Sequence, residues 1–244
     1  MTFQTGWKGL SIAVVLLVSA CATNPVTGNR EFAFMSESQE IAIGREADMQ
    51  IQQAMGVYES LALQEYVEDL GNKLALVSHR PDLPWQFTVV DSPAVNAFAL
   101  PGGFIYLTRG IMAYLGDEAE LAGVLGHEIG HLVHRQEKAL ATLVQKIPPE
   151  KGQSQLIRFA ADPEAAKLYD SRCREYEADR LSVQYVTQAG YDPTAFGRCL
   201  WRHFSYDKKE GVADVFDDSS STHPTPLKRI VRTNQEIAEQ SRNN

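Results

Sequence analysis

The sequence is short of basic residues and of nucleotide-binding signatures. Its 23 Lys and Arg stand against 31 Asp and Glu, and the formal net charge of −8 argues against a nucleic-acid-binding surface. No Gly-rich phosphate-binding loop, internal repeat or low-complexity tract occurs in it. With 244 residues, 44% hydrophobic and 22% charged, the chain is typical of a globular protein and long enough for one domain of about 200 residues.

The apolar run at the N-terminus is also short. It covers residues 10–20, which is too few to cross a bilayer and suits the hydrophobic region of a signal peptide. The run ends in "VSAC" at Cys21, which resembles the lipobox of bacterial lipoproteins, so we expect cleavage after residue 20 and lipid on Cys21. Ala22, rather than Asp, follows this cysteine and favours the outer membrane. An ordinary secretory signal with an incidental cysteine is the alternative.

Cysteine is scarce as well, with three in the chain. Apart from Cys21, only Cys173 and Cys199 remain in the mature protein. An exported protein enters an oxidising compartment, where these two can form a disulfide, but cysteines in predicted helices are often simply buried. The sequence leaves both states open.

Periodicity, capping residues and proline positions predict a mostly helical α+β protein with one small sheet. A signal peptide (1–20) and a lipidated tether (21–35) precede a single domain (36–244). Helices are expected at about 36–55, 60–78, 117–147, 162–190, 193–208 and 226–240, and strands at 85–90 and, as a pair joined through Pro101-Gly102-Gly103, within 96–110.

Histidine is rare too, yet three of the six lie in "GHEIGHLVHRQ". On a helix, His127 and His131 lie about 40° apart and about 6 Å apart along the axis, so both imidazoles can reach one metal ion. His134 shares their face but lies about 10 Å from His127, so we expect that it does not bind the metal. The pattern His-Glu-x-x-His is the zinc-protease motif, with Glu128 placed beside the metal as general base.

A catalytic zinc site needs a third protein ligand, and "SRCREYEADR" offers two candidates. Glu175 and Glu177 lie about 200° apart on a helix, so only one of them can face the metal. Glu175 shares its face with Asp179, a potential acceptor for the second nitrogen of a ligand histidine, and therefore has a modest lead.

"HEIGH" followed by "SRCREYEAD" resembles the metallopeptidase family that contains HtpX and the CAAX prenyl protease. The stretches "CATNPVTGNREF", "SESQEIAIGREAD", "DSPAVNAFALPGGFIYLTRGIMAYL", "GYDP" and "STHPTPLKRI" are similar to its periplasmic lipoprotein branch, over nearly all of residues 21–232. Where the family often carries a histidine nine residues after its first ligand, this chain has Gln136.

The resemblance implies a zincin-like (gluzincin) fold whose sheet edge faces the active-site cleft. It implies one Zn²⁺ per chain held by His127, His131 and Glu175, with Glu128 as general base. It also implies that His223 of "STHP" is an active-site histidine, acting either as a latch on the metal's open position or as an oxyanion donor.

The expected activity is that of a zinc-dependent endopeptidase of the bacterial periplasm, anchored to the outer membrane by lipid. Its expected substrates are unfolded or misfolded envelope proteins, and the outer-membrane assembly machinery is a possible partner. A periplasmic chaperone or assembly factor with a usually latched protease site is the alternative. A purely structural zinc site is a further one, but it predicts four protein ligands and gives Glu128 no role.

Overall fold

The computed structural model describes residues 21–26, 30–32, 36–133, 171–210 and 225–243. In order, the elements are β1 Cys21–Thr23, β2 Arg30–Phe32, α2 Glu37–Met55, α3 Leu61–Ala75, β3 Gln86–Val90, β4 Ala97–Leu100, β5 Phe104–Thr108, α4 Arg109–Tyr114, α5 Glu118–Val133, α9 Ser171–Gln188, α10 Ala195–Glu210 and α11 Pro226–Asn243. The mostly helical α+β prediction is confirmed.

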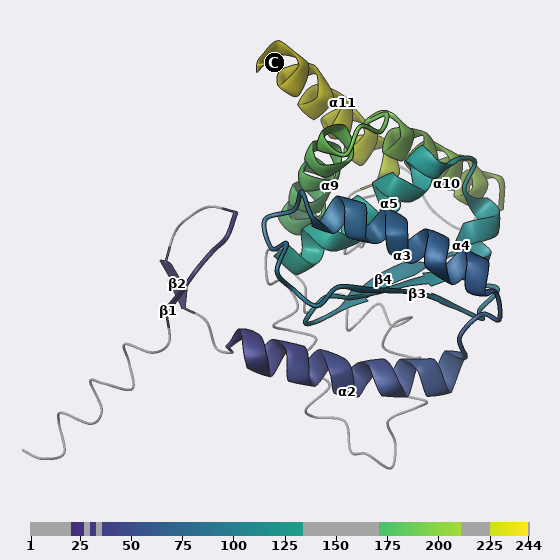
Figure 1. The fold of residues 1–244 in the computed structure, drawn as a ribbon. Coiled ribbons are helices and arrows are strands. Elements are labelled where there is room, and N and C mark those ends of the chain that lie inside the picture. The colour runs from purple at the N-terminus through teal and green to yellow at the C-terminus, as the bar shows by residue number, and fades with distance from the viewer. Residues whose placement is uncertain (1–20, 27–29, 33–35, 134–170, 211–224, 244) are drawn as a thin grey trace, which may run out of the picture.

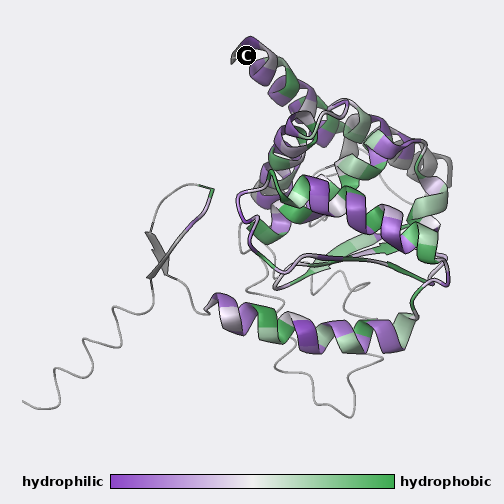
Figure 2. Cartoon of the chain, in the orientation of Figure 1, coloured by the Kyte–Doolittle hydropathy of each residue, from purple (hydrophilic) through white to green (hydrophobic). Residues whose placement is uncertain are grey.

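A three-stranded sheet in the order β3-β5-β4 lies at the centre of the fold. Strand β5 pairs in parallel with β3 and antiparallel with β4, so β4 forms an edge of the sheet. Helix α2 crosses one face, and α3 and α5 lie on the other side (Figure 1). The strands are largely hydrophobic, whereas α2 and α3 carry both hydrophilic and hydrophobic residues, as expected of helices with one buried side (Figure 2).

Helix α2 closes a small core of its own against the sheet. It begins with a capping box, in which Ser36 accepts from the backbone of Gln39 and the Gln39 side chain accepts from the Ser36 backbone. Ala47 and Ile51 are buried against sheet residues that include Phe104 and Tyr106. Tyr106 donates to the buried carboxylate of Asp48 at 2.5 Å, which satisfies both polar groups.

The larger core lies between the other face of the sheet and α3, α5, α9 and α10. The predicted helices and strands all have counterparts here. Three elements were not predicted: β1 and β2, which form a ribbon within the expected tether, and the short helix α4, where Thr108 accepts from the Ile111 backbone as the cap. In the part of the chain that the structure describes, no helix is long and apolar enough to span a membrane.

Some predictions fall outside the described residues. These are the signal peptide, the stretch after Val133 in which His134 and Gln136 lie, the start of the helix expected at residue 162, and the loop that contains His223.

Candidate metal centre

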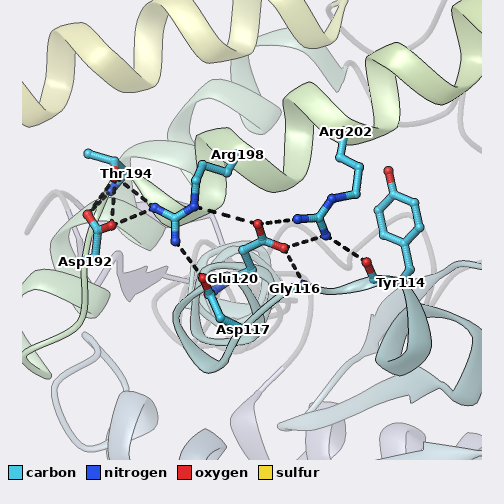
Figure 3. A network of polar contacts seen from close by, with 8 residues as sticks. All are labelled: Tyr114, Gly116, Asp117, Glu120, Asp192, Thr194, Arg198 and Arg202. Atoms are coloured by element: carbon cyan, nitrogen blue, oxygen red, sulfur yellow. Dashed lines mark hydrogen bonds and ion pairs between the residues drawn. The ribbon is translucent and has the colours of Figure 1, made fainter.

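Helix α5 carries the two histidines, and its N-terminus is tied firmly to α10. Asp117 accepts from the Glu120 backbone at 2.8 Å, as the predicted start of the helix requires. The Glu120 carboxylate, 1% exposed, accepts from the Gly116 backbone and from both terminal nitrogens of Arg202 at 2.8 Å (Figure 3). Arg198 joins Asp117 and Asp192 to the same cluster. This network fixes α5 relative to α10.

Small residues let α9 pack closely on α5. A Cβ added to Gly130 would lie 3.0 Å from the Cα and the carbonyl oxygen of Ala178, and one added to Gly126 would lie 3.1 Å from Ser182 Oγ. Ser182 also donates to the carbonyl oxygen of Gly123 at 2.7 Å. The close approach brings the N-terminal half of α9 beside the histidine pair.

Three side chains converge at this contact. His127 Nε2 lies 3.0 Å from His131 Nε2, and the two Glu175 carboxylate oxygens lie 3.6 Å and 3.5 Å from these nitrogens respectively. Ligand atoms at zinc bond lengths on a tetrahedral ion are separated by about 3.4 Å. Among the described residues, two imidazole nitrogens and one carboxylate therefore have the spacing and chemistry that zinc requires.

Glu177, the competing candidate, is turned away from the histidines. Its carboxylate accepts from Arg180 Nε at 3.0 Å, and about a third of its side chain is exposed. Glu175 is 5% exposed. The structure thus brings Glu175 rather than Glu177 to the histidine pair, as the helical geometry favoured.

Asp179 lies behind His127, where it was expected. Its Oδ1 accepts from His127 Nδ1 at 2.9 Å, so the histidine's Nε2 is directed toward His131 and Glu175. Such a carboxylate partner fixes the tautomer and orientation of a metal-binding histidine.

Arg229 of α11 is a charged residue of this site that was not predicted from the sequence. It donates to both oxygens of Asp179, at 2.9 and 2.6 Å, and lies 3.2 Å from a Glu175 oxygen. One signal was available: Arg229 lies one turn before Thr233, on the side of an amphipathic helix that becomes buried. A cation at such a position usually has a buried anionic partner.

In this cluster, neighbouring charges and burial shift the pKa values of His127 and Asp179 in opposite directions. Burial alone would lower the pKa of His127, but the hydrogen bond with Asp179 and the charges of Asp179 and Glu175 raise it, against repulsion by Arg229. Burial would raise the pKa of Asp179, yet Arg229 and His127 hold it below its usual value. Asp179 is therefore ionised at neutral pH.

Aromatic packing holds the same groups from the side of α10. The Phe196 ring stacks on His127 with centroids 5.4 Å apart, and the Arg229 guanidinium lies 5.7 Å from the Phe196 centroid. A Cβ on Gly123 would lie 2.7 Å from the Cβ of Phe196, so glycine is needed for this approach. Phe196 was not predicted, because its role depends on a contact between distant helices.

The remaining candidates are placed only in part. Glu128 is buried beside its two histidine neighbours, with 9% exposed. His223 lies outside the described residues, and Cys21 is described only as part of the β1 backbone. Cys199 is buried, and burial raises the pKa of its thiol to about 11. The side chain of Cys173 is not among the described ones, so a disulfide between Cys173 and Cys199 stays a prediction.

Comparisons with known proteins agree with this geometry. The model of peptidase family M48 matches residues 61–237. A beta-barrel assembly-enhancing protease of Yersinia pestis is 29% identical over 227 residues, 84% of this chain and 45% of that protein. The corresponding protein of Escherichia coli is 26% identical over 231 residues, 85% of this chain and 46% of that protein. Mitochondrial metalloendopeptidase OMA1 of Schizosaccharomyces pombe is 31% identical over 228 residues, 88% of this chain and 66% of that protein. The chain thus spans about half the length of the curated beta-barrel assembly-enhancing proteases that it matches.

Proposed function

This chain belongs to peptidase family M48, and we propose that it is a zinc-dependent endopeptidase that acts on unfolded proteins of the bacterial envelope. One observation carries the proposal: Nε2 of His127, Nε2 of His131 and the Glu175 carboxylate converge at ligand spacing, and Glu128 is adjacent to the first of them. We assign these three as the ligands of one Zn²⁺ and Glu128 as the general base.

When bound, zinc would lower the pKa of a water molecule and polarise the carbonyl of the peptide bond to be cleaved. Glu128 would accept the proton of that water and pass it to the departing amine. Asp179 and Arg229 would hold His127 in its ligand orientation, since both contact it or its partner directly. His223 is proposed as the active-site histidine, as a latch or as an oxyanion donor.

Strand β4 is proposed to bind the substrate backbone. It lies at an edge of the sheet and packs against α5, so an extended peptide paired with β4 would run beside the metal helix. The side chains of Ala97 and Ala99 alternate with those of Phe98 and Leu100 and are small. Recognition would therefore depend mainly on backbone hydrogen bonds, which suits unfolded proteins of varied sequence.

We propose quality control of outer-membrane proteins as the setting. Relatives from Yersinia pestis and Escherichia coli are named beta-barrel assembly-enhancing proteases, whereas others are named mitochondrial. The lipobox-like "VSAC" at Cys21 favours a bacterial outer-membrane lipoprotein that faces the periplasm. The assembly machinery of outer-membrane proteins is then a proposed partner.

A chaperone or assembly factor with a latched protease site is the second candidate. The observation that favours it is the name of relatives such as the one from Yersinia pestis, which is called a beta-barrel assembly-enhancing protease. A purely structural zinc is less favoured, because the candidate group within the described residues has three members and Glu128 lies next to it.

One experiment separates these functions. Purified protein is incubated with reduced, unfolded casein before and after metal removal with a chelator, and after addition of one equivalent of zinc or of magnesium. An endopeptidase loses cleavage on chelation and regains it with zinc alone. Suppressed casein aggregation without cleavage under every metal condition would instead favour the chaperone.

A further inference from the structure

A buried ion pair lies where three parts of the domain meet. Arg80, in the loop between α3 and β3, donates from both terminal nitrogens to the two oxygens of Glu40 in α2, at 2.8 and 2.9 Å. The side chains are 5% and 3% exposed. Because burial strips both groups of water, their remaining hydrogen-bonding capacity must be used within the protein.

Each member of the pair contacts one of the two elements beside which the substrate is proposed to bind. Arg80 Nη1 donates at 3.2 Å to the carbonyl oxygen of Leu132, the residue after His131 in the metal helix α5. Glu40 Oε1 accepts at 3.2 Å from the backbone of Gly102, in the turn that ends edge strand β4. A chain of three short polar contacts therefore joins β4 to α5.

Close packing against α2 also restricts the turn at Gly102. Gly102 has φ +85°, and a Cβ there would lie 2.7 Å from the Cα of Ile41. The turn cannot move toward α2, and the bond from Glu40 opposes movement away from it. The position of the end of β4 thus depends on Glu40.

Packing alone does not account for an ion pair at this place. A buried pair of charges is often no more stabilising than apolar side chains of similar volume. A charged pair differs in its geometry, because a planar guanidinium and a carboxylate fix both the distance and the orientation of the groups that they bind. Here the partners are backbone groups of α5 and of the turn after β4, the two elements beside which a substrate is proposed to lie.

We propose that Glu40 and Arg80 form a positioning pair that sets the separation between edge strand β4 and metal helix α5, and so determines how tightly an extended peptide binds. This inference rests on the proposed endopeptidase function. Neither residue touches the reacting atoms, so the pair should govern substrate binding and leave the metal and the chemical step largely unchanged.

The test compares Glu40→Gln with Glu37→Gln as a matched control. Glu37 bonds to the same guanidinium at 3.1 Å but is 53% exposed, where solvent screens the interaction. Binding of a fluorescein-labelled ten-residue peptide from reduced casein is measured by anisotropy in proteins that also carry Glu128→Gln. KM and kcat for the quenched form of the peptide are measured in otherwise unchanged proteins, with zinc content and thermal unfolding alongside.

We expect Glu40→Gln to weaken peptide binding and raise KM about tenfold, which corresponds to about 1.4 kcal/mol. Zinc content should be unchanged and kcat should stay within about threefold, while Glu37→Gln behaves as the wild type. Arg80→Lys, which keeps the cation but loses the planar fork, should resemble Glu40→Gln and serves if the latter does not fold.

Unchanged binding in folded Glu40→Gln and Arg80→Lys would overturn the inference, and so would a loss of zinc or a fall in kcat that matches the rise in KM. Failure of the wild-type protein to cleave any peptide would instead count against the proposed function. The anisotropy measurement would still decide the role of the pair.

Discussion

Asp179→Asn is expected to weaken zinc binding by roughly 10- to 100-fold, the usual effect of losing a carboxylate behind a ligand histidine. Both oxygens are in use: Oδ1 contacts His127 Nδ1 and Arg229 Nη2, and Oδ2 contacts Arg229 Nε. An asparagine of the same shape has only one acceptor oxygen, so its NH₂ group must face a donor of Arg229 or of His127. The affinity change corresponds to roughly 1.4–2.7 kcal/mol.

The assay is competition for zinc between each purified variant and a chromophoric chelator, with thermal unfolding as a check on folding. Glu177→Gln is the matched control, because it lies two residues away on α9 and pairs with Arg180 rather than with the metal cluster. A zinc affinity of Asp179→Asn within about twofold of wild type would refute the reasoning. An equal loss in Glu177→Gln would show that the effect is not specific to the carboxylate behind His127.

Three further predictions concern the other assigned residues. Glu175→Ala should lower zinc occupancy while Glu177→Ala should not; metal analysis of both decides this, and the opposite result would transfer the ligand role to Glu177. Cys21→Ser should abolish acylation and membrane association, measured by fractionation with a labelled fatty acid, and equal acylation of the variant would contradict the lipobox. His223→Ala should lower turnover of an unfolded substrate about 10²–10³-fold if the imidazole donates to the oxyanion and should raise it if it is a latch; rates within twofold of wild type would exclude both roles.

Local patterns were enough to predict most of the elements and to single out His127, His131 and Glu175, the candidate ligands that the structure brings together. The ends of helices and strands depend on interactions over a few residues, which the sequence shows directly. Examples are the capping box at Ser36, the turn at Gly102 and the prolines. The spacing of His127 and His131 acts over one helical turn. The choice of Glu175 over Glu177 followed from the same geometry, because the Asp179 face of α9 is the face that turns to α5.

Contacts between distant segments could not be predicted in the same way. Arg229 reaches Asp179 across 50 residues, and Arg202 reaches Glu120 across 82. The partners of Arg229 and Arg202 follow only from the packing of α9, α10 and α11 on α5, although the position of Arg229 on its amphipathic helix indicated burial. Glu40 and Arg80 are similar, since their importance depends on the backbone groups at Gly102 and Leu132.

The most direct test of the central claim is Glu128→Gln, because this side chain is assigned to the chemistry and not to metal binding. We predict that the purified variant retains one equivalent of zinc and its thermal stability but cleaves unfolded casein at least roughly 10²–10⁴-fold more slowly than wild type. Glu118→Gln, an exposed substitution of the same kind on α5, should leave the rate unchanged. Normal cleavage by Glu128→Gln with normal zinc content would contradict the account.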